Sequence, residues 1–167
     1  MASFVEGLPR CDAELVAMAR EDAAARRLTT IPGIGAINAT ALAAAVGDAG
    51  SFERGRDLAA WLGLTPRQAS TGGKPKLLGI SKRGNRYLRA NLIHGAPAVL
   101  QRMIVAETPL GRWARALSER AHRNIVAVAL AAKLARIAWA VLRKGRAYDA
   151  RLGRDGIGTR RRAVLLD

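Results

Sequence analysis

The stretch Leu28–Leu42, LTTIPGIGAINATAL, predicts two helices joined by a tight turn. Pro32 pushes the residue before it out of the α conformation and therefore ends the first helix. Gly33 and Gly35 permit the positive φ angles that a tight turn requires. In the second helix, Ala39 is small enough to let the two helices approach closely. The pattern therefore predicts a helical hairpin near the start of the chain.

This hairpin resembles the helix-hairpin-helix DNA-binding motif, in which Pro-Gly-hydrophobic-Gly is followed by an alanine. In that motif the backbone N–H groups at the turn hold a phosphate without reading the base sequence. We therefore expect Gly33 and Gly35 to bind a nucleic-acid phosphate. An ordinary turn between two helices remains the alternative, because the same residues would serve it.

The composition favours a mainly α fold. The chain has 167 residues, half of them apolar and only 4% aromatic, which suits one compact helical domain rather than a β-sandwich or barrel. The net charge of +15 indicates a polyanionic partner, DNA or RNA, or less favourably an anionic membrane surface. We expect a helical domain with a helix-hairpin-helix motif and a Gly-rich basic loop, which could form a short hairpin.

The basic loop lies in Trp61–Arg89, WLGLTPRQASTGGKPKLLGISKRGNRYLR, which contains no acidic residue. At its centre Ser70 and Thr71 precede two glycines. Ser81 is a good helix N-cap, so we expect the following helix to present basic residues to a phosphate. The predicted phosphate-binding side chains are Arg67, Lys74, Lys76, Lys82, Arg83, Arg86 and Arg89.

Further helices are expected downstream. Pro97 is expected to break or kink the helix that begins after Ser81, whereas Thr108 and Pro109 begin another. The segment Ile125–Leu142 is apolar enough to suggest a membrane span. It contains two basic residues, each costing about 2.5–3.5 kcal/mol at a bilayer centre, so a buried or interface helix is favoured.

Several classes of site are disfavoured. His94 and His122 are isolated and Cys11 is the one cysteine, so we expect no zinc site and no internal disulfide. The acidic residues show no grouping that would hold two metal ions. Gly72-Gly73-Lys74 lacks the spacing of a nucleotide-binding loop. The lone cysteine and the absence of an evident signal peptide favour a cytoplasmic location.

A serine hydroxyl attacks a phosphodiester only if its proton is removed and the developing charge is stabilised. The neighbouring Arg and Lys side chains could stabilise that charge, but nothing close in sequence supplies a base. On the residues alone, the favoured interpretation is that Ser70 and Thr71 shape a turn and bind a phosphate by hydrogen bonds.

Four motifs occur in fixed order, namely PGIG, AAWLGLTPRQ, STGGK and GISKRGNRYLR. Together with the flanking sequence over residues 27–148, they resemble the C-terminal domain of the bridge-RNA-guided insertion-sequence transposases, insertion-sequence family 110. The chain departs from the family at Ala96-Pro97, where an Ala-Arg pair is expected.

The resemblance implies a DNA recombinase whose serine nucleophile forms a covalent link to DNA. That serine lies ten residues before Ile80, which is Ser70, with Thr71 as the fallback. The family also has an N-terminal ribonuclease-H-like domain in which four acids hold Mg²⁺. This chain lacks room for that domain, so we expect a truncated or separated half, inactive alone and binding no metal itself.

The resemblance also implies DNA, a guide RNA and full-length transposase copies or a second copy of this chain as partners. We divide the chain into a helical remnant at 1–26, the serine domain at 27–148 with the helix-hairpin-helix motif at 28–46, and a flexible basic tail at 149–167. Two other functions remain open: a non-catalytic nucleic-acid-binding module, and an assembly protein that associates through its apolar 125–142 helix.

Overall fold

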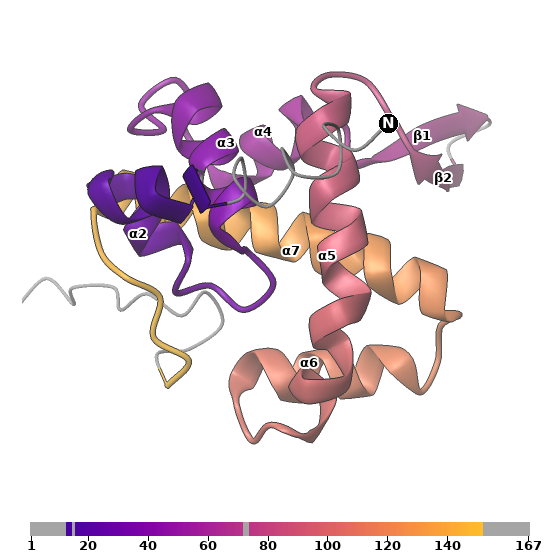
Figure 1. Ribbon diagram of the computed structural model, residues 1–167. Helices are drawn as coiled ribbons and strands as arrows, with labels where there is room; N and C mark the ends of the chain where they lie inside the picture. The colour runs from indigo at the N-terminus through magenta and orange to yellow at the C-terminus, as the bar shows by residue number, and fades with distance from the viewer. Residues whose placement is uncertain (1–12, 15, 72–73, 152–167) are drawn as a thin grey trace, which may run out of the picture.

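The computed structural model describes residues 13, 14, 16–71 and 74–151. It confirms the mainly α prediction, because a single two-stranded sheet accompanies the helices among these residues (Figure 1). A helical segment at 16–21 precedes the named elements. These are α2 (Ala23–Leu28), α3 (Ala36–Val46), α4 (Gly55–Trp61), β1 (Pro66–Thr71), β2 (Lys74–Ile80), α5 (Arg86–Val105), α6 (Pro109–Ser118) and α7 (Arg123–Lys144).

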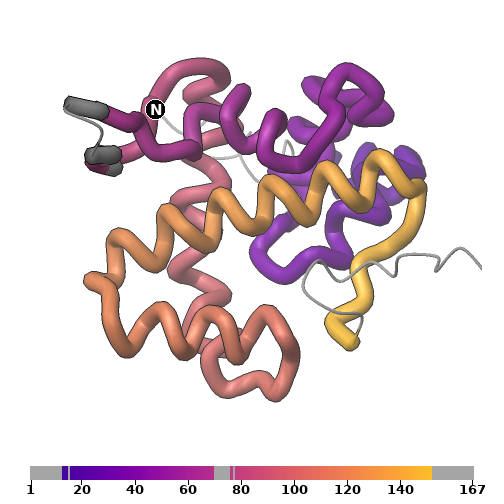
Figure 2. Tube along the Cα trace, turned by 180° about the vertical axis from the view of Figure 1, so that it is seen from behind, coloured from indigo at the N-terminus to yellow at the C-terminus, as the bar shows by residue number. Residues whose placement is uncertain are grey.

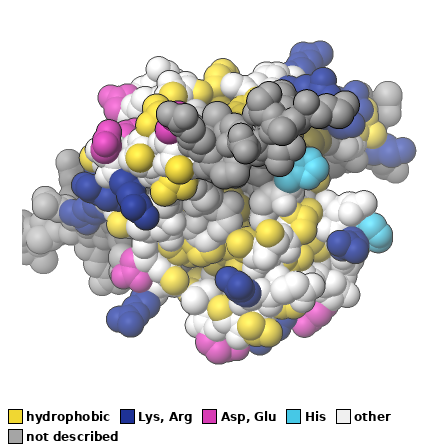
Figure 3. Space-filling view, viewed as in Figure 1, with side chains coloured by type: hydrophobic (Ala, Val, Ile, Leu, Met, Phe, Trp, Pro, Cys, Tyr) yellow, Lys and Arg dark blue, Asp and Glu magenta, His cyan; other side chains and the backbone are white. Residues whose placement is uncertain are grey.

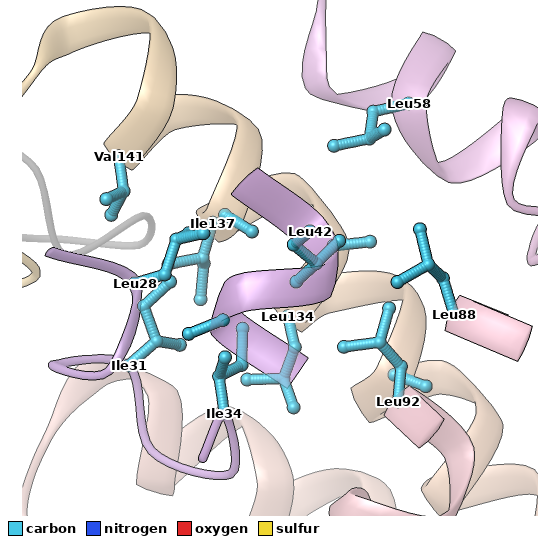
Figure 4. Close-up of a cluster of buried hydrophobic side chains, with 14 of the residues drawn as sticks. Leu28, Ile31, Ile34, Leu42, Leu58, Leu88, Leu92, Leu134, Ile137 and Val141 are labelled. Atoms are coloured by element: carbon cyan, nitrogen blue, oxygen red, sulfur yellow. The ribbon is translucent and has the colours of Figure 1, made fainter. Parts of the chain in front are cut away.

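Helix α7 forms the centre of the fold. It contacts α2, α4, α5 and α6, and α5 crosses it (Figures 1 and 2). Apolar residues at helical spacing line its buried side and meet side chains from the other helices (Figure 4). The cluster in that view includes Leu28, Ile31, Ile34, Leu42, Leu88, Leu92, Leu134, Ile137 and Val141.

By length and composition, α7 is the one helix in the described part of the chain that could cross a membrane. Within its most apolar window, 67% of the residues are buried inside the fold. This burial confirms the prediction of a buried helix. The basic residue Lys133 is itself 5% exposed, and its ammonium group lies 5.4 Å from the ring centroid of Trp113 in α6.

The predicted helical hairpin is formed by α2 and α3. Gly33 has a φ of +89°, as the turn requires, and Ala39 and Leu42 are fully buried. The turn rests on α5, because a Cβ atom at Gly95 would lie 2.9 Å from the carbonyl oxygen of Gly33. The backbone N–H of Tyr148 donates to Thr30 Oγ1 at 2.8 Å, which attaches the segment after α7 to the same turn.

Strands β1 and β2 form an antiparallel hairpin that projects from the helices (Figure 1). The short-hairpin alternative is therefore the correct one for the basic loop. At its base the N–H of Ser81 donates to the Thr65 carbonyl at 2.9 Å, and the N–H of Lys82 donates to that of Gly63 at 3.1 Å. The hairpin is thus attached to the helices at its base.

Two predictions about α5 are wrong. Its N-cap is Asn85, whose side chain accepts from Leu88 N at 3.0 Å, rather than Ser81, which the hairpin base holds in a non-helical conformation. The predicted break at Pro97 is also wrong, because the helix continues through it; the alternative of a kink stays a prediction. Pro97 is exposed while Leu92 and Met103 on either side are buried, so packing keeps the helix continuous despite the missing N–H. The predicted start at Thr108 and Pro109 is confirmed for α6.

Candidate nucleic-acid interface

The hairpin places Ser70 and Thr71 at the end of β1, away from the helices. Ser70 pairs with Pro75 and Thr71 pairs with Lys74 across the two strands. The predicted turn at Gly72-Gly73 lies outside the described residues. The two candidate hydroxyl residues therefore lie beside the tip of a projecting hairpin.

Basic residues follow the hairpin along its length. Lys76 is exposed and pairs with Ala69, and the exposed Arg67 lies where the strand register shifts between Pro66 and Gln68. Together with the pairing of Lys74, this puts three of the predicted phosphate-binding residues on the same two strands as Ser70.

The segment between β2 and α5 presents three more cations. Lys82, Arg83 and Arg86 are all exposed. Lys82 has a φ of +57° and Gly84 a φ of +87°, so this segment turns sharply before α5 begins. Two glycines, which have no side chain, set the path of this segment.

Two glycines fix that path by interlocking with the end of α4. A Cβ atom at Gly84 would overlap the carbonyl oxygen of Trp61, and one at Gly63 would overlap the carbonyl oxygen of Arg83. Gly63 also has a positive φ, +71°. Larger residues cannot fit at either position. Glycine at both lets the backbone at the end of α4 contact the backbone of Arg83 and Gly84, and this contact holds Lys82 and Arg83 outward.

Arg89 differs from the other predicted cations. Its side chain is buried, with 9% of the residue exposed, and Nη1 donates to the carbonyl oxygens of Leu62 at 3.1 Å and Arg83 at 3.3 Å. Arg86 and Arg89 lie in the same helix, but only Arg86 is exposed, because Arg89 faces the end of α4 and the backbone of Arg83. Arg89 thus joins the end of α4 to the basic segment instead of facing a phosphate.

The helical hairpin forms a second candidate phosphate site. Gly35 is exposed and is the N-cap of α3, and no side chain caps this helix. A hollow of about 490 Å³ lies there, between the start of α3 and one face of α5. An uncapped helix N-terminus directs free N–H groups and a partial positive charge toward an anion.

Sequence reasoning missed three polar residues in that hollow, namely Asn38, Asn91 and His94. The spacing of Asn91 and His94, i and i+3, indicated a shared helix face. Nothing in the sequence indicated that this face of α5 lies opposite the glycine turn, because that juxtaposition depends on the packing of the helices.

Charge is distributed unevenly over the surface. On the face shown in Figure 3, Lys and Arg gather over the hairpin and the start of α5, with no Asp or Glu among them. The acid-free sequence from Leu58 to Ala106 accounts for this distribution. Such a surface attracts a polyanion, and its effect weakens as salt is added.

The acidic side chains of the described residues are dispersed. No three His, Cys, Asp or Glu side chains come together among them. Several acids already have local roles: Asp22 and Asp57 accept hydrogen bonds at helix starts, and Glu107 accepts from Arg115 at 2.7 Å. That hydrogen bond and the attraction of Arg115 lower the pKa of Glu107.

Comparison with known proteins identifies the family. The sequence model described as Transposase IS116/IS110/IS902 family matches residues 25–119, which is more than half of the chain. The match begins in α2 and extends just past the end of α6, so it includes both candidate phosphate sites.

Individual relatives agree. The chain is 49% identical over 141 residues to a Pseudomonas aeruginosa protein named "Probable family 20 transposase", covering 84% of this chain and 42% of the relative. It is 45% identical over 144 residues to the transposase for insertion sequence element IS1328 of Yersinia enterocolitica, covering 86% and 43%. It is 32% identical over 130 residues to the pilin gene-inverting protein of Moraxella bovis, covering 75% and 38%. The chain thus spans about two fifths of the length of these relatives, and it belongs to the IS116/IS110/IS902 transposase family.

Proposed function

We propose that this chain is the serine-bearing DNA-recombining part of a transposase, and that Ser70 is its nucleophile. The observation that carries the proposal is the position of Ser70 beside the tip of a projecting hairpin whose strands and base carry exposed cations. Thr71 is the alternative nucleophile at the same tip. DNA is the expected substrate, since insertion-sequence transposases act on it.

In the proposed step the Ser70 oxygen attacks a phosphodiester phosphorus. A new P–O bond joins the serine to one DNA strand, and the P–O bond to the departing sugar oxygen breaks. The hydroxyl proton passes to a base, and the departing oxygen takes up a proton. Lys74, Lys76 and Arg67 would stabilise the charge on the phosphate in the transition state.

The sequence around Ser70 contains no acid from Leu58 to Ala106 that could act as the base. We propose that the base, and the Mg²⁺ that the family resemblance implies, belong to the part of the longer relatives that this chain does not span. The chain would then cut DNA only when that part is added in the same or another polypeptide, together with a guide RNA.

The test is to trap the covalent product. The chain is incubated with DNA carrying the element ends, Mg²⁺ and guide RNA, with and without the remaining part of a relative, and DNA-linked protein is separated on a denaturing gel. We expect an adduct only in the complete mixture, lost in Ser70→Ala and retained in Thr71→Ala. An adduct that survives Ser70→Ala but not Thr71→Ala would assign the role to Thr71. The absence of an adduct in every mixture would contradict the recombinase proposal.

A second function is favoured by the uncapped start of α3 beside an exposed Gly35. The chain would then be a non-catalytic module that binds nucleic acid through the helical hairpin. This alternative predicts DNA binding that weakens steeply with salt and is unchanged by Ser70→Ala. Binding that does not depend on salt would contradict it.

A further inference from the structure

A groove of about 1090 Å³ lies at the base of the hairpin, on the side facing the first half of α7. Its floor is aliphatic and comes from distant parts of the sequence: Leu64, Leu78 and Ile80 from the hairpin region, and Ile125 and Val128 from α7. Ile125 is 59% exposed and Leu78 is 40% exposed. Leaving this much aliphatic surface in water is unfavourable, so its burial by a partner would be stabilising.

The rim of the groove is basic. Arg56 and Arg136 lie on the helical side, and Arg67 and Lys82 lie on the hairpin side; no acid is among the residues that line it. A partner that fits must therefore offer apolar side chains flanked by acidic ones.

The shape suits a helix better than a nucleotide. The α7 residues that line the groove run from Asn124 to Arg136, about 18 Å at about 1.5 Å per helical residue. An unstacked base would need an aromatic face to stack on. Trp113 is the one aromatic residue that lines the groove, and its ring already carries the ammonium group of Lys133. A helix that inserts apolar side chains into such a groove is a common recognition mode.

The chain itself contains a segment that combines apolar and acidic side chains. Residues 12–22 hold four of the 13 acidic residues and only one of the 28 basic residues. Residues 16–21 are helical, and Met18 is 53% exposed there, three and four residues before the acids Glu21 and Asp22, a spacing that places them on one side. No other stretch of that length is as acidic, whereas the remainder of the chain is strongly basic.

We propose that the groove binds the acidic segment at 16–22, which is helical at 16–21, of a second copy of this chain. The exposed Met18 of that segment would lie on the groove floor, and Glu21 and Asp22 would lie against the basic rim. This inference does not depend on Ser70 or on DNA cleavage.

Sedimentation velocity of the full chain over a range of concentrations tests it. We expect reversible self-association, weakened at least about tenfold by Val128→Asp, which puts a charge on the groove floor. Arg56→Glu, on the exposed rim, is expected to weaken it about three- to tenfold with no risk to the core. The matched control is Arg143→Glu, which makes the same change of charge as Arg56→Glu at an exposed position outside the groove, on the helix that carries Val128. It should have little effect on association.

A charge exchange identifies the occupant. Glu21→Arg alone should weaken association, and combining it with Arg56→Glu should recover at least part of the loss. A chain that is monomeric at every concentration, or association that Val128→Asp and Arg56→Glu leave unchanged, would overturn the proposal. Weaker DNA binding by Arg56→Glu with unchanged association would overturn it as well, and would assign the groove to nucleic acid.

Discussion

Arg89 donates a hydrogen bond of 3.1 Å to the carbonyl oxygen of Leu62, so a residue of α5 holds the end of α4, 27 positions earlier in the sequence. The same nitrogen also donates to the carbonyl oxygen of Arg83. The entire hairpin lies between Leu62 and Arg83. One buried guanidinium thus stabilises both ends of the segment from which the candidate nucleophile projects.

Replacing Arg89 is therefore expected to destabilise the fold. Arg89→Ala leaves two carbonyl oxygens without their donor and should lower the free energy of unfolding by about 2–4 kcal/mol, measured by urea denaturation. The exposed Arg86 is the matched control, and Arg86→Ala should change stability by less than about 0.5 kcal/mol. Equal effects of the two substitutions would contradict the structural role of Arg89.

The two glycines of the helical hairpin should behave differently. Gly33→Ala should lower the free energy of unfolding by at least about 1 kcal/mol. An L-residue is strained at positive φ, and the new Cβ would lie 3.0 Å from Val99 Cγ2.

Gly35 has a φ of −80° and open space where a Cβ would be, so Gly35→Ala should change stability by less than about 1 kcal/mol. Its effect should appear in DNA affinity, because the methyl group lies beside the N–H groups that we expect to bind phosphate. Filter binding compares the DNA affinity of Gly35→Ala with that of Gly79→Ala, where a new Cβ would also meet open space. Equal affinities would show that the turn is purely structural.

The exposed cations of the basic segment should account for part of the salt dependence of DNA binding. Each phosphate contact contributes about 0.9 to the slope of log affinity against log salt. Lys82→Ala and Arg83→Ala should each reduce the slope by about that amount, as measured by fluorescence anisotropy on duplexes of unrelated sequence. Arg143→Ala, which removes an exposed charge from the end of α7, should reduce it less.

Tyr148 provides a pH-dependent prediction. Burial, with a smaller contribution from Asp149, raises the pKa of Tyr148. The folded pKa thus exceeds the unfolded one, so the stabilising contribution is fully present below about pH 10 and is lost as pH rises through the folded pKa. The chain has two tyrosines, so the tyrosinate absorbance of a Tyr87→Phe variant reports Tyr148 alone. Its midpoint should lie above the midpoint of the same variant in urea, and identical midpoints would contradict the burial.

The sequence was sufficient where a local signal decides the structure. A break before Gly33 was expected, and α2 ends at Leu28, four residues before Pro32. Thr108 and Pro109 began α6, and the positive φ of Gly33 follows from the turn that it forms. Ser70 and its surrounding charge were also found from sequence, although its chemical role depended on a family resemblance and stays a prediction.

Predictions failed where tertiary contacts outweigh a local preference. Ser81 is a good N-cap, but its N–H is bonded to Thr65 in the hairpin base, and so the helix starts at Arg86. The later start leaves Lys82 outside the helix, and the burial of Arg89 follows from its contacts with Leu62 and Arg83, which sequence spacing does not reveal. The groove and the hollow near Asn91 join residues far apart in sequence, which local patterns do not bring together.

The attachment of the hairpin at its base makes its reach independent of the core. A strand advances about 3.3 Å per residue, so adding two residues to each strand would move the tip outward by about 7 Å and preserve which side chains share a face. The helices, Arg89 and the glycine interlock would be untouched. Members of one family could therefore engage DNA at different depths by varying hairpin length alone, and this chain offers a frame on which that distance can be engineered.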